Sequence, residues 1–253
     1  MPSRPAPTPA DGRRPASRHR ANIDTAALAH NLALVGHGTV VDLSGDAYGH
    51  GAETVAAVVA SLPDDGKPGL RSLGVRSARE LAVLAELGIQ AELLDSPLLG
   101  APDDDELSSL TERIYGVGTE PVMRVSADVV NTKIVATGDG VSYGYTWRAS
   151  EPTAIALIAL GYADGVLRSA GNTARVLLGG GMRRLVGRVA MDACVVEIGP
   201  ADRLRDVAIG DHAVLFGEPG VAESGLGHWA STLGVPPLSV TSGVGARVPR
   251  IPT

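Results

Sequence analysis

The chain has 253 residues, which is long enough for one large domain or two domains of ordinary size. Its composition, 44% apolar and 20% charged, is typical of a soluble globular protein. The net charge is −6, so no basic surplus indicates nucleic acid or an anionic membrane as a partner. The sequence contains no apolar run of roughly 18 residues that would span a membrane and no secretion signal, so we expect a cytoplasmic protein.

The first 21 residues are rich in proline and arginine and contain almost no apolar side chains. Such a segment cannot bury enough surface to offset the entropy that it loses on ordering. We therefore expect residues 1–21 to form a disordered tail and order to begin at Asn22. A basic binding arm is the less favoured alternative, because prolines interrupt the segment and lysines are scarce.

Residues 22–119 alternate short β-branched runs with stretches of helical periodicity. Three such βα units in succession indicate a parallel sheet with right-handed crossovers. Ser77 and Glu80 have the spacing of a capping box, which predicts the start of one of the helices. The expected elements are a strand at Thr39–Leu43, a helix at Ala52–Leu62, a strand at Arg71–Val75, the helix that follows Ser77, and a strand at Ile89–Leu94.

From residue 120 onward, short β-branched runs such as 121–125 and 131–136 are separated by glycines, which is typical of an all-β domain. Gly179-Gly180-Gly181 predicts a hairpin turn rather than a phosphate loop, because no helix follows it. The only cysteine, Cys194, is expected to be a buried core residue. We predict an α+β fold, with a partial parallel βα domain over 22–119 and an all-β domain over 120–253.

Five motifs of the chain resemble those of one enzyme family, and they occur in the family's order. They are Ser44-Gly45-Asp46-Ala47-Tyr48-Gly49-His50-Gly51, Val141-Ser142-Tyr143-Gly144, Gly161-Tyr162-Ala163-Asp164-Gly165, Gly187-Arg188-Val189-Ala190-Met191-Asp192 and Arg247-Val248-Pro249-Arg250. The family is that of the alanine racemases. The resemblance implies a domain derived from a TIM barrel, a complete C-terminal β-domain, and the interconversion of L-alanine and D-alanine with the cofactor pyridoxal phosphate (PLP).

The resemblance also implies roles for individual residues. Tyr162 matches the acid/base tyrosine that reaches into the barrel of the other subunit, which implies a dimer. Met191 and Asp192 match the residues that hold the substrate carboxylate and orient the site, and Tyr48 matches a residue beside the cofactor. Without the resemblance, Tyr162 would be interpreted as a turn tyrosine, and Asp164 and Asp192 would be turn or cap residues as readily as active ones. No spacing of histidines and cysteines indicates a metal site.

The same resemblance fails at the residues that carry the family's chemistry. Ser44 stands where the family has the lysine that binds PLP as a Schiff base, and a hydroxyl cannot replace that amine. Neither Lys67, in an expected exposed turn, nor Lys133, in the β-domain, is expected to substitute for it. Leu238 stands where the family has a tyrosine that contacts the cofactor phosphate.

The first domain is also too short for a complete barrel. Roughly 80 residues lie between Asn22 and Pro102, whereas a barrel takes about 250, so about five βα units are missing. We therefore expect a truncated family member that is inactive alone and binds PLP weakly or not at all. The alternatives are a non-catalytic partner that contributes Tyr162 and Met191 in trans to a full-length racemase, and a degenerate remnant. A homodimer and a heterodimer with such a racemase both remain open.

Overall fold

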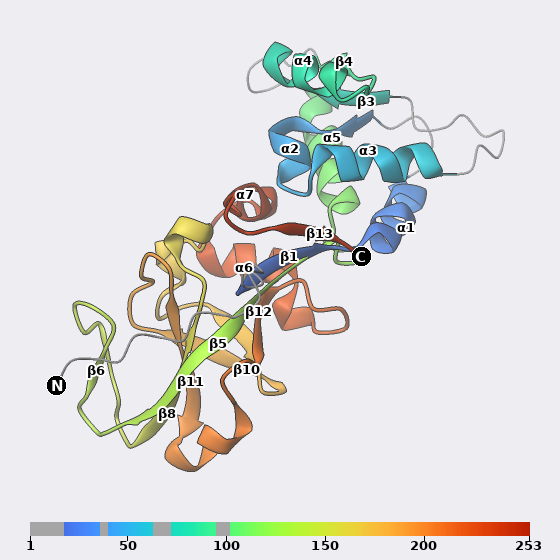
Figure 1. The fold of residues 1–253 in the computed structure, drawn as a ribbon. Coiled ribbons are helices and arrows are strands. Elements are labelled where there is room, and N and C mark those ends of the chain that lie inside the picture. Colours follow the sequence, from blue (N-terminus) through green and yellow to red (C-terminus); the bar gives the residue numbers. More distant parts are fainter. Residues whose placement is uncertain (1–17, 36–39, 63–71, 95–101) are drawn as a thin grey trace, which may run out of the picture.

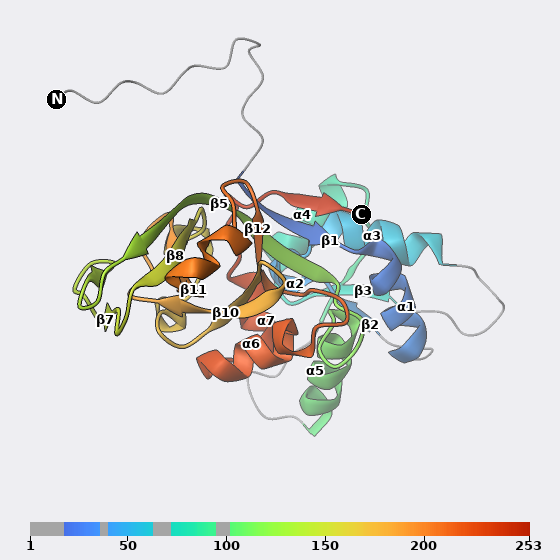
Figure 2. The same cartoon turned by 90° about the horizontal axis from the view of Figure 1, so that it is seen from below.

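The computed structural model describes residues 18–35, 40–62, 72–94 and 102–253. These residues form a small region of helices and short parallel strands and a larger region of β-strands (Figure 1). Strands β1 (His19–Ile23) and β13 (Arg250–Pro252) run between the two regions. A view turned by 90° also separates the β region from the helical region (Figure 2).

The β region is built on an eight-stranded sheet in the order β12-β9-β10-β11-β8-β5-β1-β13. A further pairing between β12 and β5 closes six of these strands into a barrel. The small antiparallel pair of β6 (Gly140–Val141) and β7 (Trp147–Arg148) stands beside it. The remaining strands are β5 (Met123–Val135), β8 (Thr153–Ile158), β9 (Arg175–Leu178), β10 (Gly181–Val186), β11 (Cys194–Pro200) and β12 (His212–Phe216).

The hairpin between β9 and β10 is confirmed. Gly179 and Gly180 take φ values of 57° and 73°, as a tight turn between antiparallel strands requires. In contrast, the runs at 121–125 and 131–136 do not form two strands, because β5 continues from Met123 to Val135 with a bulge after Val129. Two polar residues interrupt the apolar run in the sequence. Ser126 is nevertheless buried, and Asp128 pairs with Arg20 and His212.

Strand β1 changes the predicted start of the ordered chain. It pairs antiparallel with β5 and parallel with β13, so that Ala21 lies opposite both Val125 and Arg250. Ala21 and Ile23 are fully buried, and the Nδ1 atom of His19 lies 2.9 Å from the carbonyl oxygen of Ala159. The expected tail over 1–21 is therefore corrected at residues 19–21, which belong to the sheet of the β region. Residues 1–17 fall outside the described part of the chain.

The helical region confirms the predicted parallel βα units. Its strands pair in parallel in the order β2-β3-β4, which is also their order along the chain. Asn31 is fully buried and joins the first helix to the end of α5, because its side-chain amide donates to the carbonyls of Ile114 and Glu120. The elements are α1 (Thr25–Val35), β2 (Val40–Asp42), α3 (Ala52–Ser61), β3 (Ser72–Val75), α4 (Ala78–Glu86), β4 (Glu92–Leu93) and α5 (Pro102–Ile114).

The segment that follows β2 is a left-handed turn, α2 (Ser44–Tyr48). The residues from Gly45 to Tyr48 have φ values between 51° and 63°, a conformation that costs non-glycine residues roughly 1–2 kcal/mol each. The carboxylate of Asp46 supports the turn by accepting the N–H of Ala52 at 2.8 Å. A Cβ on Gly49 would collide with the carbonyl of Thr241, so this position admits only glycine.

His50 packs this turn against the end of α5. Its ring is fully buried and stacks on Tyr115, with 4.6 Å between the ring centroids. Nδ1 lies 2.9 Å from the carbonyl oxygen of Ala47, whereas Nε2 has no hydrogen-bond partner within the described residues. Burial lowers the pKa of His50 to about 4, because the charged ring would lose its hydration.

This lowered pKa predicts an acid-sensitive fold. Between pH 6.5 and about 4 the unfolded chain binds a proton that folded His50 rejects, so the free energy of unfolding falls as the pH drops. The full shift corresponds to about 3 kcal/mol. We expect His50→Gln to remove this share of the acid dependence in urea unfolding at pH values across the window. His30→Gln, at an exposed position of α1, should keep it. Equal acid dependence of the wild type and His50→Gln would contradict the prediction.

Candidate functional site

The motifs that contain Tyr162 and Met191 lie side by side. Tyr162 begins a short 3-10 turn, η1 (Tyr162–Asp164), and its backbone N–H donates to the carbonyl of Ala190 at 3.0 Å. The N–H of Ala163 donates to the carbonyl of Met191, also at 3.0 Å. A Cβ on Gly161 would collide with both of these carbonyls, which explains the glycine before Tyr162.

Tyr162 and Met191 point outward, with 39% and 54% of their surface exposed. The guanidinium of Arg168 lies 5.5 Å from the Tyr162 ring and donates to the hydroxyl of Tyr143 at 2.6 Å. Arg188 in turn lies 5.5 Å from the Tyr143 ring. We call these five residues the tyrosine face. Tyrosine, arginine and methionine are the side chains that protein interfaces favour, so this face has the composition of a contact surface.

Asp192 lies next to this face, and its carboxylate is bound by Arg247. The Nη2 atom of Arg247 donates to Oδ1 of Asp192 at 2.6 Å, and its Nε atom lies 3.3 Å from Oδ1 of the buried Asp164. The three residues that the resemblance assigns to the β-domain side of a site, Tyr162, Met191 and Asp192, are thus brought together.

Ser44 and Tyr48 lie at the other candidate centre, around the buried carboxylate of Asp42. Oδ1 of Asp42 accepts the N–H of Ser44 at 2.9 Å, and Oδ2 accepts the Tyr48 hydroxyl at 2.8 Å. The Nε atom of Arg76 donates to Oδ2 of Asp42 at 3.0 Å, and the Arg76 N–H donates to Oγ of Ser44 at 3.0 Å. Burial, followed by the charge of Asp42, raises the pKa of Tyr48, so the Tyr48 hydroxyl keeps its proton and donates a hydrogen bond to Asp42.

The predicted capping box at α4 is only half formed. The Ser77 hydroxyl accepts the backbone N–H groups of Arg79 and Glu80, as an N-cap does. The carboxylate of Glu80 instead accepts the N–H of Gly45, at 2.6 Å. This side chain therefore joins the helix to the turn that begins with Ser44.

A cavity of about 440 Å³ lies beside Tyr48, between α5 and α7 (Pro237–Ser242). Its lining residues are Tyr48, Arg76, Ser108, Thr111, Glu112, Pro236, Leu238, Ser239 and Ser242. No lysine is among these described residues, so nothing in the lining offers the amine of a Schiff base. The guanidinium of Arg76 is paired with Asp42, and that of Arg250 donates to backbone carbonyls, including that of Gly49 at 3.0 Å. The described residues of this centre therefore offer no group that could form a Schiff base with PLP.

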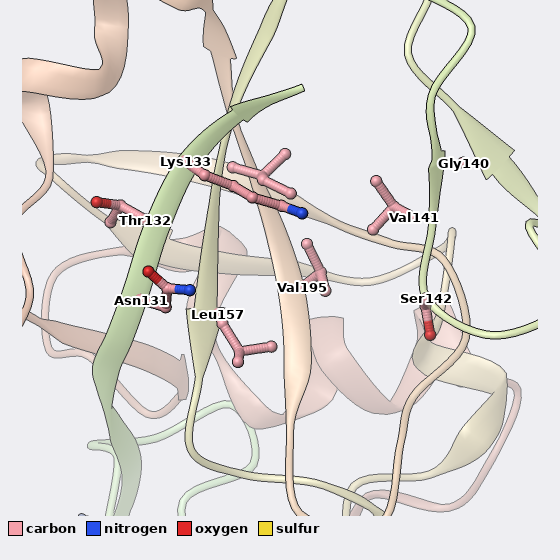
Figure 3. A pocket seen from close by; sticks show the side chains of 9 residues that line it. Asn131, Thr132, Lys133, Gly140, Val141, Ser142, Leu157 and Val195 are labelled. Carbon is pink, nitrogen blue, oxygen red and sulfur yellow. The ribbon is translucent and has the colours of Figure 1, made fainter. Parts of the chain in front are cut away.

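Lys133 belongs to a different pocket, of about 210 Å³, on β5 (Figure 3). Its amine points toward Val141 and Val195, over a floor of apolar side chains from β8 and β11. Neither Ser44 nor Tyr48 lines this pocket. Lys67, the other lysine of the sequence, falls outside the described residues.

The described residues also contain no reactive cysteine, no metal site and no membrane-spanning helix. The Cys194 thiol is buried and donates to the carbonyl of Leu160, and burial raises its pKa to about 12, so it is a poor nucleophile. Among the side chains of residues 18–35, 40–62, 72–94 and 108–253, no group of three histidines, cysteines, aspartates or glutamates gathers as a metal site would require. None of the described helices is long and apolar enough to cross a membrane.

Two residues of the Ser44 centre, Asp42 and Arg76, were not singled out from the sequence. Asp42 interrupts the apolar run of its strand, and a charge in a short buried strand is a usable signal of a partner. Arg76 offers no comparable signal, because an arginine after a strand is common. Arg247 belongs to a motif that the sequence shows, but the sequence does not show that its partners are Asp164 and Asp192.

Comparisons with known proteins identify the family. The model of the alanine racemase C-terminal domain matches residues 122–252, just over half of the chain. The alanine racemase of Frankia casuarinae is 43% identical over 133 residues, which are 53% of this chain and 34% of the relative. That of Mycolicibacterium smegmatis is 33% identical over 249 residues, which are 90% of this chain and 62% of the relative. The chain thus spans less than two thirds of these relatives' length.

Solved structures agree in fold. The alanine racemase of Streptomyces coelicolor A3(2) matches with a TM-score of 0.76 at 21% identity, over 94% of this chain and 98% of that one. The alanine racemase of Clostridium difficile 630 matches with a TM-score of 0.77 at 18% identity, over 95% of this chain and 96% of that one. At such identities the likeness shows the fold alone. From the family model and the fold together, the chain belongs to the alanine racemase family.

Proposed function

We propose that this chain carries the β-domain half of an alanine racemase site, binds PLP weakly or not at all, and does not racemise alanine by itself. The proposal rests on the side chain at position 44, which is a serine hydroxyl and is already hydrogen-bonded. Its hydroxyl is a poor substitute for an amine and already accepts the N–H of Arg76. The family's reaction depends on PLP as the electron sink, so a chain that cannot hold the cofactor lacks the central chemical group.

The β-domain half supports the other part of the proposal. Tyr162, Met191 and Asp192, which the resemblance assigns to one site, lie on two loops that are joined by backbone hydrogen bonds. A phenol in such a position serves as a proton donor or acceptor when a substrate lies within hydrogen-bond reach. Under this proposal, the chain has the tyrosine that transfers a proton but lacks the lysine and the PLP that the reaction also requires.

The first test mixes the purified chain with PLP and L-alanine. We expect neither the visible absorbance of a protein-bound Schiff base nor D-alanine formation, because Ser44 offers no amine. Ser44→Ala should behave as the wild type does. Lys67→Ala and Lys133→Ala show whether any absorbance comes from another lysine. Turnover that Tyr162→Phe abolishes would overturn the proposal, and absorbance lost in either lysine variant would mean that the site has been rebuilt elsewhere.

The tyrosine face favours a second candidate function, that of a partner subunit. Its five residues are partly or well exposed, and two arginines order the tyrosine rings. An exposed aromatic surface of this composition is typical of an interaction site. In this candidate, the chain supplies Tyr162 and Met191 to the barrel of a full-length racemase, which supplies the lysine and PLP.

Complementation tests the second candidate. A full-length racemase is made inactive by replacing its own residue equivalent to Tyr162 with phenylalanine, and this chain is then added. We expect a mixed complex in size-exclusion chromatography and restored D-alanine formation. Because a positioned acid/base group contributes roughly 10²–10⁴-fold, Tyr162→Phe should lower the restored rate at least about 100-fold. Tyr145→Phe is the matched control, since Tyr145 is exposed and lies outside the tyrosine face.

Two results would count against the partner function. If no mixed complex forms and no activity returns, the chain does not act in trans. Poor solubility of the chain both with and without the racemase would instead favour the degenerate remnant.

A further inference from the structure

We propose that Arg247 is a positioning residue, whose guanidinium holds the loop of Tyr162 and the loop of Met191 and Asp192 in one fixed arrangement. Its importance for catalysis depends on the function proposed above, in which Tyr162 and Met191 act together. The geometry that supports it does not depend on that function.

The two loops come from different parts of the β region. Tyr162–Asp164 follows β8, whereas Met191 and Asp192 precede β11. Arg247 approaches both from a third segment, between α7 and β13. With Nη2 on Asp192 at 2.6 Å and Nε near Asp164 at 3.3 Å, one planar guanidinium spans the two loops.

Asp164 depends on this contact more than Asp192 does. The Asp164 side chain is 1% exposed, and its Oδ2 atom accepts the N–H of Gly161 at 2.9 Å. Its Oδ1 atom accepts no well-aligned hydrogen bond within the described residues and faces Arg247, with Nε2 of His19 more distant at 3.9 Å. A buried carboxylate without a cation is unfavourable, so Arg247 compensates a charge that the turn has enclosed.

Without the guanidinium, the carboxylates of Asp164 and Asp192 would lose the cation that they share. Like charges repel, and the exposed Asp192, with 59% of its side chain accessible, is free to move toward solvent. Met191 precedes Asp192 directly and would move with it. The hydrogen bond from Ala163 to the Met191 carbonyl would then be the first to weaken.

The segment that carries Arg247 is itself well fixed. The N–H of Gly245 donates to the carbonyl of Asp164 at 2.9 Å, and the carbonyl oxygen of Arg247 lies 3.1 Å from Nε2 of His19. Three residues later, Arg250 donates to the carbonyl of Gly49 in the loop that follows Ser44. The Arg247-Val248-Pro249-Arg250 motif thus contacts both candidate centres, and its first arginine has a rigid base from which to act.

The test compares Arg247→Ala and Arg247→Lys with Arg203→Ala, which removes an arginine from an exposed pair with Asp206. Hydrogen exchange is measured at the amides of Tyr162 and Ala163, and ¹⁹F spectra are recorded on chains that carry 3-fluorotyrosine. The Tyr162 resonance is assigned with Tyr162→Phe.

For Arg247→Ala we expect about tenfold faster exchange at these two amides, unchanged exchange in β8 and β11, and a shifted Tyr162 resonance. Arg247→Lys should recover part of both effects, because it restores the charge but not the planar fork. Arg203→Ala should match the wild type. Unchanged exchange in Arg247→Ala would overturn the proposal, and so would an equal loss of protection across β8 and β11, which indicates a general stabilising role.

If Arg247→Ala does not fold, Asp192→Asn provides the same test, because it weakens only the exposed end of the bridge. It should accelerate exchange at Ala163 and leave β8 and β11 unchanged. These measurements use the chain alone, so they succeed or fail independently of the complementation assay. Where complementation succeeds, Arg247→Ala should lower kcat, because Tyr162 is displaced, and raise KM, because Met191 is displaced, while the mixed complex still forms.

Discussion

The pairing of β1 with β5 and β13 is the constraint on which the arrangement of the two regions depends. It places Ile23 opposite both Met123 and Pro252, and Ile23 also accepts the N–H of Thr253 at 2.9 Å. Helix α1 starts directly after β1, so the first element of the helical region is set by the sheet of the β region. The end of α5 returns to the same sheet through β5. Both connections of the helical region therefore lead to neighbouring strands of one sheet.

This constraint explains how three parallel strands persist without a closed barrel. In a complete barrel, each strand is held by neighbours on both sides and the active site forms at the carboxyl ends of the strands. In this chain that end is held by internal contacts around Asp42, and the hydroxyl of Tyr115 adds a hydrogen bond to the Asp42 carbonyl at 2.7 Å. The polar side chains around Asp42 thus join β2, α2 and the segment after β3.

The sequence predicted features that depend on residues close together in the chain, and it missed those that depend on contacts between residues far apart in the chain. The hairpin at Gly179 and Gly180, the βα units and the order of the motifs depend on neighbouring residues or on family resemblance. By contrast, β1 contains His19, Arg20 and Asn22, and it is a strand only because β5 and β13 flank it. The bridge from Arg247 to Asp192 joins residues 55 positions apart, and no local pattern carries that information.

The contacts around Tyr162 and Met191 bear on whether the chain is a degenerate remnant. A buried ion pair such as that of Asp164 is weak evidence for a stabilising role, because well-packed apolar residues often replace buried ion pairs at no loss. The same holds for the close approach at Gly161, which only fixes one loop against another. Both features nevertheless persist, and together they hold two side chains, Tyr162 and Met191, that are exposed and contribute little to the core. A chain without selection would be expected to lose such contacts before it lost its apolar packing. Under the proposed partner function these contacts have a role, because they position the two side chains that the chain would supply to a racemase.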